Sequence, residues 1–204
     1  MPALDHLVYG VPDLLEGVRG FAGATGVEPA PGGRHVGRGT ANCLVGLGGG
    51  AYLEIIGPDP GGSDAQRLPF GVDKLTASRL LTWCVRPSDL DQCLADARAR
   101  GYDPGEPAAM SREAASGDLL EWRLTPDSTA EDGLMPFLID WGASTHPSEG
   151  PLPEVRLVSL SAISPDPDRV RRQLSTIGLI LDVRPGDRPA LSAVLATPRG
   201  ELTL

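Results

Sequence analysis

The segment LDHLVYGVPDL, residues 4–14, decides the fold of this chain. An apolar run that contains one histidine gives way, after a glycine, to a Val-Pro-Asp cluster, and the apolar period changes there from that of a strand to that of a helix. The same change recurs at residues 81–90 (LTWCVRPSDL) and 158–170 (VSLSAISPDPDRV). Repeated strand–helix units bury their sheet faces against each other, so we expect several such units with a ligand cleft between them.

Three helices and eleven strands are predicted along the chain. Helices are predicted over residues 12–23, 88–100 and 166–176, and Pro12 suits a first helical turn because its missing N–H has no partner there anyway. Residues 24–39 contain only a weak strand, and two polar linkers cover residues 57–74 and 142–153. The predicted strands are residues 4–10, 40–47, 51–56, 79–85, 107–112, 119–124, 134–141, 155–163, 179–183, 191–196 and 201–204.

Composition and charge restrict the class of protein. The 204 residues are 41% hydrophobic, enough for a core, and the net charge of −9 repels phosphate backbones and anionic lipid, so neither nucleic acid nor membrane is an expected partner. No apolar stretch approaches the roughly 20 residues that span a bilayer, and no signal peptide is visible. Three cysteines without a CxxC pair are expected to be reduced thiols, which indicates the cytoplasm.

Three segments carry a resemblance to a known family: residues 4–15 (LDHLVYGVPDLL), 32–57 (GGRHVGRGTANCLVGLGGGAYLEIIG) and 134–147 (LMPFLIDWGASTHP). Together with the three strand–helix changes, they resemble the vicinal oxygen chelate superfamily, in its branch of glyoxalase-like, bleomycin-resistance and dioxygenase-like proteins. The resemblance implies an α+β fold of repeated βαβββ modules, with mixed curved sheets, helices on the outer faces and a cleft between modules.

The same resemblance implies the module boundaries. We expect a first module over residues 1–57, a second over residues 75–142 and a shortened third over residues 153–204, all within one compact domain. The third module is expected to complete the cleft or to cap it.

The family's metal ligands map onto His6 and Glu54, which match the ligands of the first and last strands of the first module. The resemblance therefore implies a divalent metal such as Zn, Fe, Mn or Ni, held by imidazole and carboxylate. A full set of four ligands is not evident, because the second module has Leu81 or Thr82 where a histidine would fall. The third module has Ser159 or Ser161 at that place, and Asp140 is the acid on the last strand of the second module.

Without a metal, both residues have other roles. Glu54 lies in the apolar run YLEII, where an unpaired carboxylate is costly to bury, so it points into a wet cleft, pairs with an arginine or binds a cation. A desolvated Glu54 in the cleft could act as a general base. His6 is alternatively a core or cleft histidine with a satisfied hydrogen bond.

Further ligand-binding candidates flank these two residues. Arg34, His35 and Arg38 lie in the glycine-rich stretch GGRHVGRGT, which suits either an anionic substrate or a solvated surface loop. Asn42 is a hydrogen-bonding candidate, Asp140 and Trp141 flank the end of the second module, and His146 is expected to make a loop hydrogen bond. Trp141 is either a cleft wall or a core indole.

These observations favour a cytoplasmic glyoxalase-like protein that acts on a small oxygen-rich metabolite, with lyase, isomerase or ring-cleaving dioxygenase chemistry. Two alternatives stay open. One is a metal-free protein that binds a small molecule or sequesters a drug, which the missing partner histidine favours. The other is a degenerate domain that serves mainly in self-association as a homodimer.

Overall fold

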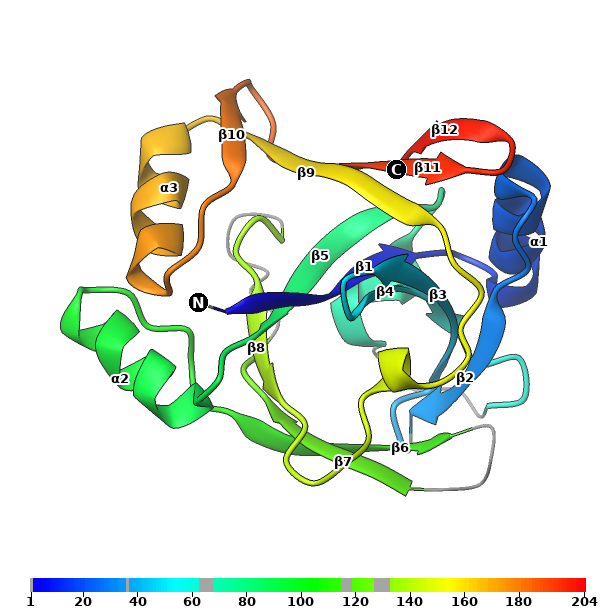
Figure 1. Ribbon diagram of the computed structural model, residues 1–204, viewed down its shortest axis with the longest axis horizontal. Helices are drawn as coiled ribbons and strands as arrows, with labels where there is room; N and C mark the ends of the chain where they lie inside the picture. The colour runs from blue at the N-terminus through cyan, green and yellow to red at the C-terminus, as the bar shows by residue number, and fades with distance from the viewer. Residues whose placement is uncertain (1, 36, 63–67, 115–118, 127–132) are drawn as a thin grey trace.

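A computed structural model describes residues 2–35, 37–62, 68–114, 119–126 and 133–204 of the chain (Figure 1). The helices are α1 (Leu14–Thr25), α2 (Leu90–Ala99), α3 (Pro167–Thr176) and two short 3-10 helices, η1 (Pro69–Lys74) and η2 (Pro147–Glu149). The strands are β1 (Ala3–Gly10), β2 (Ala30–His35), β3 (Thr40–Gly48), β4 (Ala51–Pro58), β5 (Arg79–Arg86), β6 (Ala108–Ala114), β7 (Leu119–Leu124), β8 (Phe137–Asp140), β9 (Arg156–Ser164), β10 (Asp182–Pro185), β11 (Ala190–Thr197) and β12 (Gly200–Thr203).

The first eight strands close into one barrel in the order β1-β4-β3-β2-β6-β7-β8-β5. Strands β1–β4 come with α1 and strands β5–β8 with α2, so each half of the barrel is one βαβββ unit. Two antiparallel seams join the halves, β1 with β5 and β2 with β6. The predicted α+β fold of repeated βαβββ modules is confirmed, and the space between the first two modules is the interior of this barrel.

The third βαβββ unit forms a separate four-stranded sheet in the order β10-β9-β11-β12. In Figure 1 this sheet crosses the barrel from α3 to α1. Its buried side chains, among them Val183 and Leu195, belong to the same core cluster as Leu7 of β1 and Trp83 of β5. Leu7 and Trp83 are register partners, and both lie outside the cluster that fills the barrel, so the third sheet covers the outer face of the β1–β5 seam.

Each α-helix begins behind an aspartate, which explains the recurring change of period. The side chains of Asp13, Asp89 and Asp166 accept hydrogen bonds from backbone N–H groups three residues later, each at 2.9 Å. Such N-caps satisfy donors that have no partner within the helix. Pro12 precedes the N-cap of α1 and therefore lies outside the helix, contrary to the prediction.

The other departures from prediction are at segment ends. The strand predicted over residues 134–141 begins only at Phe137, because the backbone carbonyl of buried Leu134 instead accepts a 2.8 Å hydrogen bond from the indole of Trp83. The first predicted linker ends in η1, whereas its residues 63–67 lie outside the described part of the chain. The second linker contains η2, and the strand predicted over residues 179–183 is β10, which begins at Asp182.

In the ranges that the structure describes, no helix combines the length and the apolar character that crossing a membrane requires.

Candidate functional site

The barrel encloses a cavity of about 290 Å³. All of its lining residues come from the first two modules and from the segment that contains η1, and none comes from the third sheet. They are His6, His35, Arg38, Asn42, Tyr52, Glu54, Ile56, Pro69, Phe70, Ala108, Met110, Arg112, Trp122, Leu124, Pro126, Phe137, Ile139 and Trp141.

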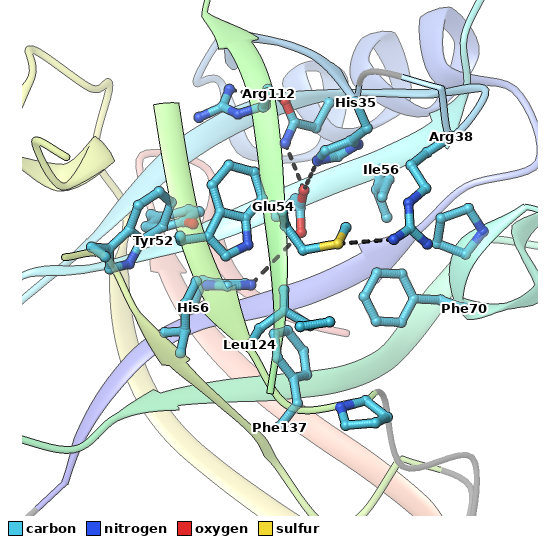
Figure 2. A pocket seen from close by; sticks show the side chains of 18 residues that line it. His6, His35, Arg38, Tyr52, Glu54, Ile56, Phe70, Arg112, Leu124 and Phe137 are labelled. Carbon is cyan, nitrogen blue, oxygen red and sulfur yellow. Dashed lines mark hydrogen bonds and ion pairs between the residues drawn. The ribbon is translucent and has the colours of Figure 1, made fainter. Parts of the chain in front are cut away.

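The lining divides into a polar group and a larger apolar wall. Figure 2 shows the carboxylate of Glu54 near the centre, with His35 and Arg112 on one side of it and His6 on the other. Phe70, Leu124 and Phe137 lie on the opposite side of the view, away from Arg112. The cavity therefore offers charge and hydrogen-bonding groups to one part of a ligand and aromatic and aliphatic surface to the rest.

An irregularity in β1 brings two neighbouring side chains into the site. In the pairing of β1 with β5, Leu4 lies opposite Val85 and His6 opposite Cys84, so Asp5 is the extra residue of a β-bulge. Successive side chains of a regular strand point to opposite faces, but a bulge re-aims them. As a result the carboxylate of Asp5 lies 2.7 Å from Nδ1 of His6.

Asp5 is a fully buried carboxylate with a complete set of partners. Its second oxygen lies 3.1 Å from Nε1 of Trp141 and 3.0 Å from Nε2 of His146. A guanidinium nitrogen of Arg86 is 3.8 Å away. These donors join β1, the end of β8 and the loop before η2, and they explain how a carboxylate with no exposed surface is tolerated.

The hydrogen bonds of Asp5 determine which nitrogen of each histidine carries the proton. Burial by itself would raise the pKa of Asp5, but hydrogen bonds and charge from His146 and His6 outweigh it and hold that pKa well below its ordinary value. An ionised carboxylate only accepts hydrogen bonds. His6 therefore carries a proton on Nδ1, and its Nε2 lies 3.8 Å from Oε2 of Glu54.

Glu54 on β4 is the meeting point of the polar group. Its Oε1 accepts a 2.5 Å hydrogen bond from the side-chain amide of Asn42 and lies 3.5 Å from Nε2 of His35. Its Oε2 faces His6. The Glu54 side chain is 8% exposed, so it is nearly desolvated and yet borders the cavity.

His35 lies next to Glu54 as a neutral ring. Burial lowers the pKa of His35 and outweighs the opposing effect of the Glu54 charge, while the positive charges of Arg112 and Arg38 lower it further. Its Nδ1 is 2.9 Å from the hydroxyl of Thr40.

Of the residues predicted to bind ligand, the structure places four at the cavity: His35, Arg38, Asn42 and Trp141. The two predicted metal ligands, His6 and Glu54, line it as well.

Arg34 and Asp140 lie elsewhere because of strand alternation. On β2 the neighbour of cavity-lining His35 faces outward, and Arg34 pairs there with Asp59 at 2.7 Å. On β8, Ile139 lines the cavity, so Asp140 points away and bonds Arg123 at 2.9 Å. Neither residue therefore lines this cavity.

Three residues at or next to the site were not anticipated in their roles. Asp5 stands beside His6, but strand alternation assigns it to the other face. Arg112 comes from β6, whose pairing with β2 is set by contacts remote in sequence. His146 makes the expected loop hydrogen bonds, to Ser148, and also contacts Asp5. A charged residue within an apolar run is the signal that singles out Asp5 and His6 together.

The donors of the site fit a divalent metal only in part. Imidazole and carboxylate suit such an ion, and the hydrogen bond from His6 to Asp5 is the kind that orients metal-bound histidines. In the described part of the chain, however, the three-donor cluster that meets within 4.8 Å is Asp5, His6 and Cys84. Asp5 is already saturated, and burial holds the pKa of the Cys84 thiol well above its ordinary value, whereas a metal needs the thiolate.

The pair His6 and Glu54 thus has suitable chemistry, but among the described residues no third His, Cys, Asp or Glu donor lies within 4.8 Å of both, whereas catalytic metal sites usually have three protein ligands. Thr82, at the expected position in the second module, is buried and does not line the cavity.

Comparison with known proteins gives one family and several structures. A family model described as a glyoxalase-like domain matches residues 4–178. No curated protein matches the chain. The crystal structure of a hypothetical protein from Staphylococcus aureus is similar, with a TM-score of 0.69 and 14% sequence identity over 93% of this chain and 88% of that one. At this identity the likeness concerns the fold alone.

Methylmalonyl-CoA epimerases appear at lower similarity. The enzyme from Mycobacterium tuberculosis has a TM-score of 0.40 and 18% identity, covering 67% of this chain and 84% of that one. A variant of the Streptomyces coelicolor enzyme in complex with 2-nitronate-propionyl-CoA has a TM-score of 0.45 and 19% identity, covering 71% and 98%. These scores carry no argument about the site of this chain.

Proposed function

The chain belongs to the glyoxalase-like domain family, and on that premise we propose that it is an enzyme that moves a proton on a small oxygen-rich metabolite held inside its barrel. The observation that carries the proposal is the position of Glu54, a nearly desolvated carboxylate that borders a cavity and lies between two imidazoles. Proton transfer at carbon is a step common to isomerases and lyases, and we place this protein in one of those classes.

Glu54 is the proposed general base. Its carboxylate takes a proton from a carbon next to a carbonyl group; the C–H electron pair becomes a C=C bond, and the carbonyl π pair moves to oxygen. The lining includes the guanidiniums of Arg38 and Arg112, which favour negative charge on that oxygen. Return of the proton to a carbon completes an isomerisation, whereas loss of a leaving group completes an elimination.

His6 and Asp5 support this base. Because ionised Asp5 keeps a proton on Nδ1 of His6, the ring is oriented with its Nε2 toward Glu54. A proton collected by Glu54 therefore has a second base 3.8 Å away. Asn42 fixes the other oxygen of Glu54 and so sets the direction of the free lone pairs.

A divalent metal is compatible with the same residues. His6 and Glu54 would hold it, and His35 is the nearest further imidazole to Glu54. When bound, such an ion polarises substrate oxygens as a Lewis acid. Metal analysis of the purified protein, beside His6→Ala and Glu54→Ala, measures this role without an activity assay: loss of a near-stoichiometric metal in both variants supports it.

A second candidate function, binding without catalysis, is favoured by the apolar wall. Twelve of the eighteen lining residues are aliphatic, aromatic, thioether or proline side chains. Such a lining retains a ligand by burial, with polar groups supplying orientation.

Exchange of substrate hydrogen for deuterium separates the two functions. The protein is incubated in D₂O with α-hydroxy ketones and 2-oxo acids, with and without Zn, Fe, Mn or Ni, and the C–H signals are followed by NMR. We expect exchange in the natural protein and a loss of about 100-fold or more in Glu54→Gln, the usual size of a general-base contribution. Glu201→Gln, an exposed change in the third sheet, is the matched control and should exchange at the natural rate.

Equal exchange in Glu54→Gln and the natural protein would refute the role of Glu54. Saturable binding with no exchange for any compound would favour the binding protein.

A further inference from the structure

The proposed site also indicates what kind of molecule it holds. Resting on the proposed function, we infer that the ligand is a small monocarboxylate with a flat apolar body, its carboxylate bound by Arg112 and Arg38.

Arg112 is a buried cation whose partner is neutral. The residue is 4% exposed, and one guanidinium nitrogen lies 3.3 Å from the side-chain oxygen of Asn42. Within the described ranges, no carboxylate lies at salt-bridge distance from Arg112. A buried charge without a counter-ion is costly, and a guanidinium has five N–H donors, so this residue is suited to an anion that enters the cavity.

Arg38 is the second cation of the lining. Its guanidinium lies 2.9 Å from the sulfur of Met110, a weak and uncharged acceptor. Figure 2 shows Arg112 and Arg38 on either side of His35, with the guanidinium of Arg38 close to the ring of Phe70. Guanidinium groups bind carboxylates with paired, charge-assisted hydrogen bonds.

The balance of charge favours a monoanion. The lining contains two guanidiniums, those of Arg38 and Arg112, against one carboxylate, that of Glu54. A carboxylate neutralises the one excess positive charge. A phosphate of charge near −2 would exceed it and would face Glu54 as well.

The remaining wall suits a flat apolar body. The ring centroids of Trp122 and Trp141 are 5.2 Å apart, and those of Phe70 and Phe137 are 5.9 Å apart. Two aromatic pairs therefore line the apolar part of the cavity. A volume of about 290 Å³ is at the small end of ligand sites. It accommodates one ring with a short acidic arm, whereas a nucleotide-bearing ligand would remain largely outside.

Calorimetric titration of the full-length protein with matched probes tests this inference. The probes are 3-phenylpropanoate, 3-phenyl-1-propanol, hexanoate and 3-phenylpropyl phosphate. Benzoate and phenylacetate are added because they shorten the chain between the ring and the carboxylate. We expect 3-phenylpropanoate to bind about 10-fold or more tightly than the alcohol, the usual effect of hydrogen bonds to a charged group. Arg112→Gln should weaken the acid about 10- to 100-fold and the alcohol less than about twofold.

The controls separate charge at the site from charge in general. Arg98→Gln removes an exposed arginine that pairs with Asp103 and Glu106, and it should leave both affinities unchanged. Circular dichroism of Arg112→Gln verifies that this variant folds. Arg38→Gln alters a more exposed residue and provides an independent measurement of the loss of affinity for 3-phenylpropanoate.

Each of the following outcomes would refute one part of the inference. Equal affinity for acid and alcohol, tighter binding of the phosphate, or no binding of any carboxylate at millimolar concentration refutes the monocarboxylate, and hexanoate equal to 3-phenylpropanoate refutes the flat body. Glu54→Gln should still bind 3-phenylpropanoate. Carboxylate binding without hydrogen exchange would therefore leave this inference standing while the proposed chemistry fails, and exchange on uncharged ketones alone would do the reverse.

Discussion

Asp5 shows how one extra residue in a strand can create a site. The β-bulge turns its carboxylate to the same side as His6, where it gathers N–H donors from three parts of the chain. Without the bulge, Asp5 would place a charge against the outer core that contains Leu7. The residue thus connects a local irregularity of β1 to the tautomer of the histidine beside Glu54.

Replacement of Asp5 by asparagine should be costly and should change the pH dependence of stability. The free energy of unfolding is expected to fall by about 3 kcal/mol near pH 7, because the buried N–H donors of His6, Trp141 and His146 lose their ionised partner. The pKa of Asp5 is lower in the folded chain, so its contribution is complete above the unfolded pKa and declines as the pH falls below about 4. Denaturant unfolding at several pH values should therefore show the difference from the natural protein shrinking between about pH 5 and 3.

Asp168→Asn is the matched control, since this carboxylate is exposed and pairs with exposed Arg171. A difference for Asp5→Asn that stays constant down to pH 3 would contradict the assigned ionisation.

The sequence predicted some site residues but not others. His6 and Glu54 were predicted from a family pattern, His35 from its place beside two arginines in a glycine-rich stretch, and Asn42 from its hydrogen-bonding side chain. Arg34 comes from the same stretch as His35, and alternation along β2 turns it away from the cavity. Arg112 was missed, since its place follows from the β2–β6 seam, a pairing between residues 77 to 81 positions apart in the sequence.

At the scale of elements, local chemistry accounts for most boundaries. Aspartate caps set the helix starts, and the glycines between β3 and β4 adopt the left-handed backbone that their hairpin needs. The exception is η1, predicted as plain linker, whose Phe70 has a φ of 55°. Phenylalanine rarely adopts this conformation, so its position beside Gly71 gave no sequence signal for an aromatic wall at the cavity.

The backbone strain at Phe70 can be measured by two replacements that both remove the ring. Phe70→Gly should be more stable than Phe70→Ala by about 1 kcal/mol, because only glycine adopts a positive φ without penalty. In most other backbone conformations the alanine variant would be the more stable of the two. Denaturant unfolding of both variants gives the difference.

The same pair of replacements at Leu119, an exposed residue of β7, is the control and should favour alanine. Equal stability of the two Phe70 variants would show that the strain is absent.

At the scale of the whole molecule, the barrel and the third sheet share one core. Gly46 of β3 also exchanges backbone hydrogen bonds with Pro153 and Val155, at 2.8 and 2.9 Å, where the chain enters the third unit. The family resemblance read from the sequence is confirmed by the match over residues 4–178. The use of the third sheet as an outer cover, rather than as part of the ligand space, depends on packing between modules and was not predictable from local patterns.

A shared core predicts that the two parts unfold together. Leu195→Ala in β11 should lower the free energy of unfolding by about 3 kcal/mol, as a core cavity does. Hydrogen exchange measured by mass spectrometry should show the same loss of protection in the slowest amides of β1 and β5 as in those of β9. Ile180→Ala, at a residue 98% exposed, should change neither. Loss of protection confined to the third sheet would mean that it unfolds separately.

The aromatic composition gives this barrel an optical property. The chain has three tryptophans: Trp122 and Trp141 line the cavity, whereas Trp83 is fixed in the outer core by its hydrogen bond to Leu134. A molecule that enters the barrel meets two of the three fluorophores, while the third remains in a constant environment. Intrinsic emission thus reports occupancy against an internal reference, so libraries of unlabelled compounds can be screened on the unmodified protein.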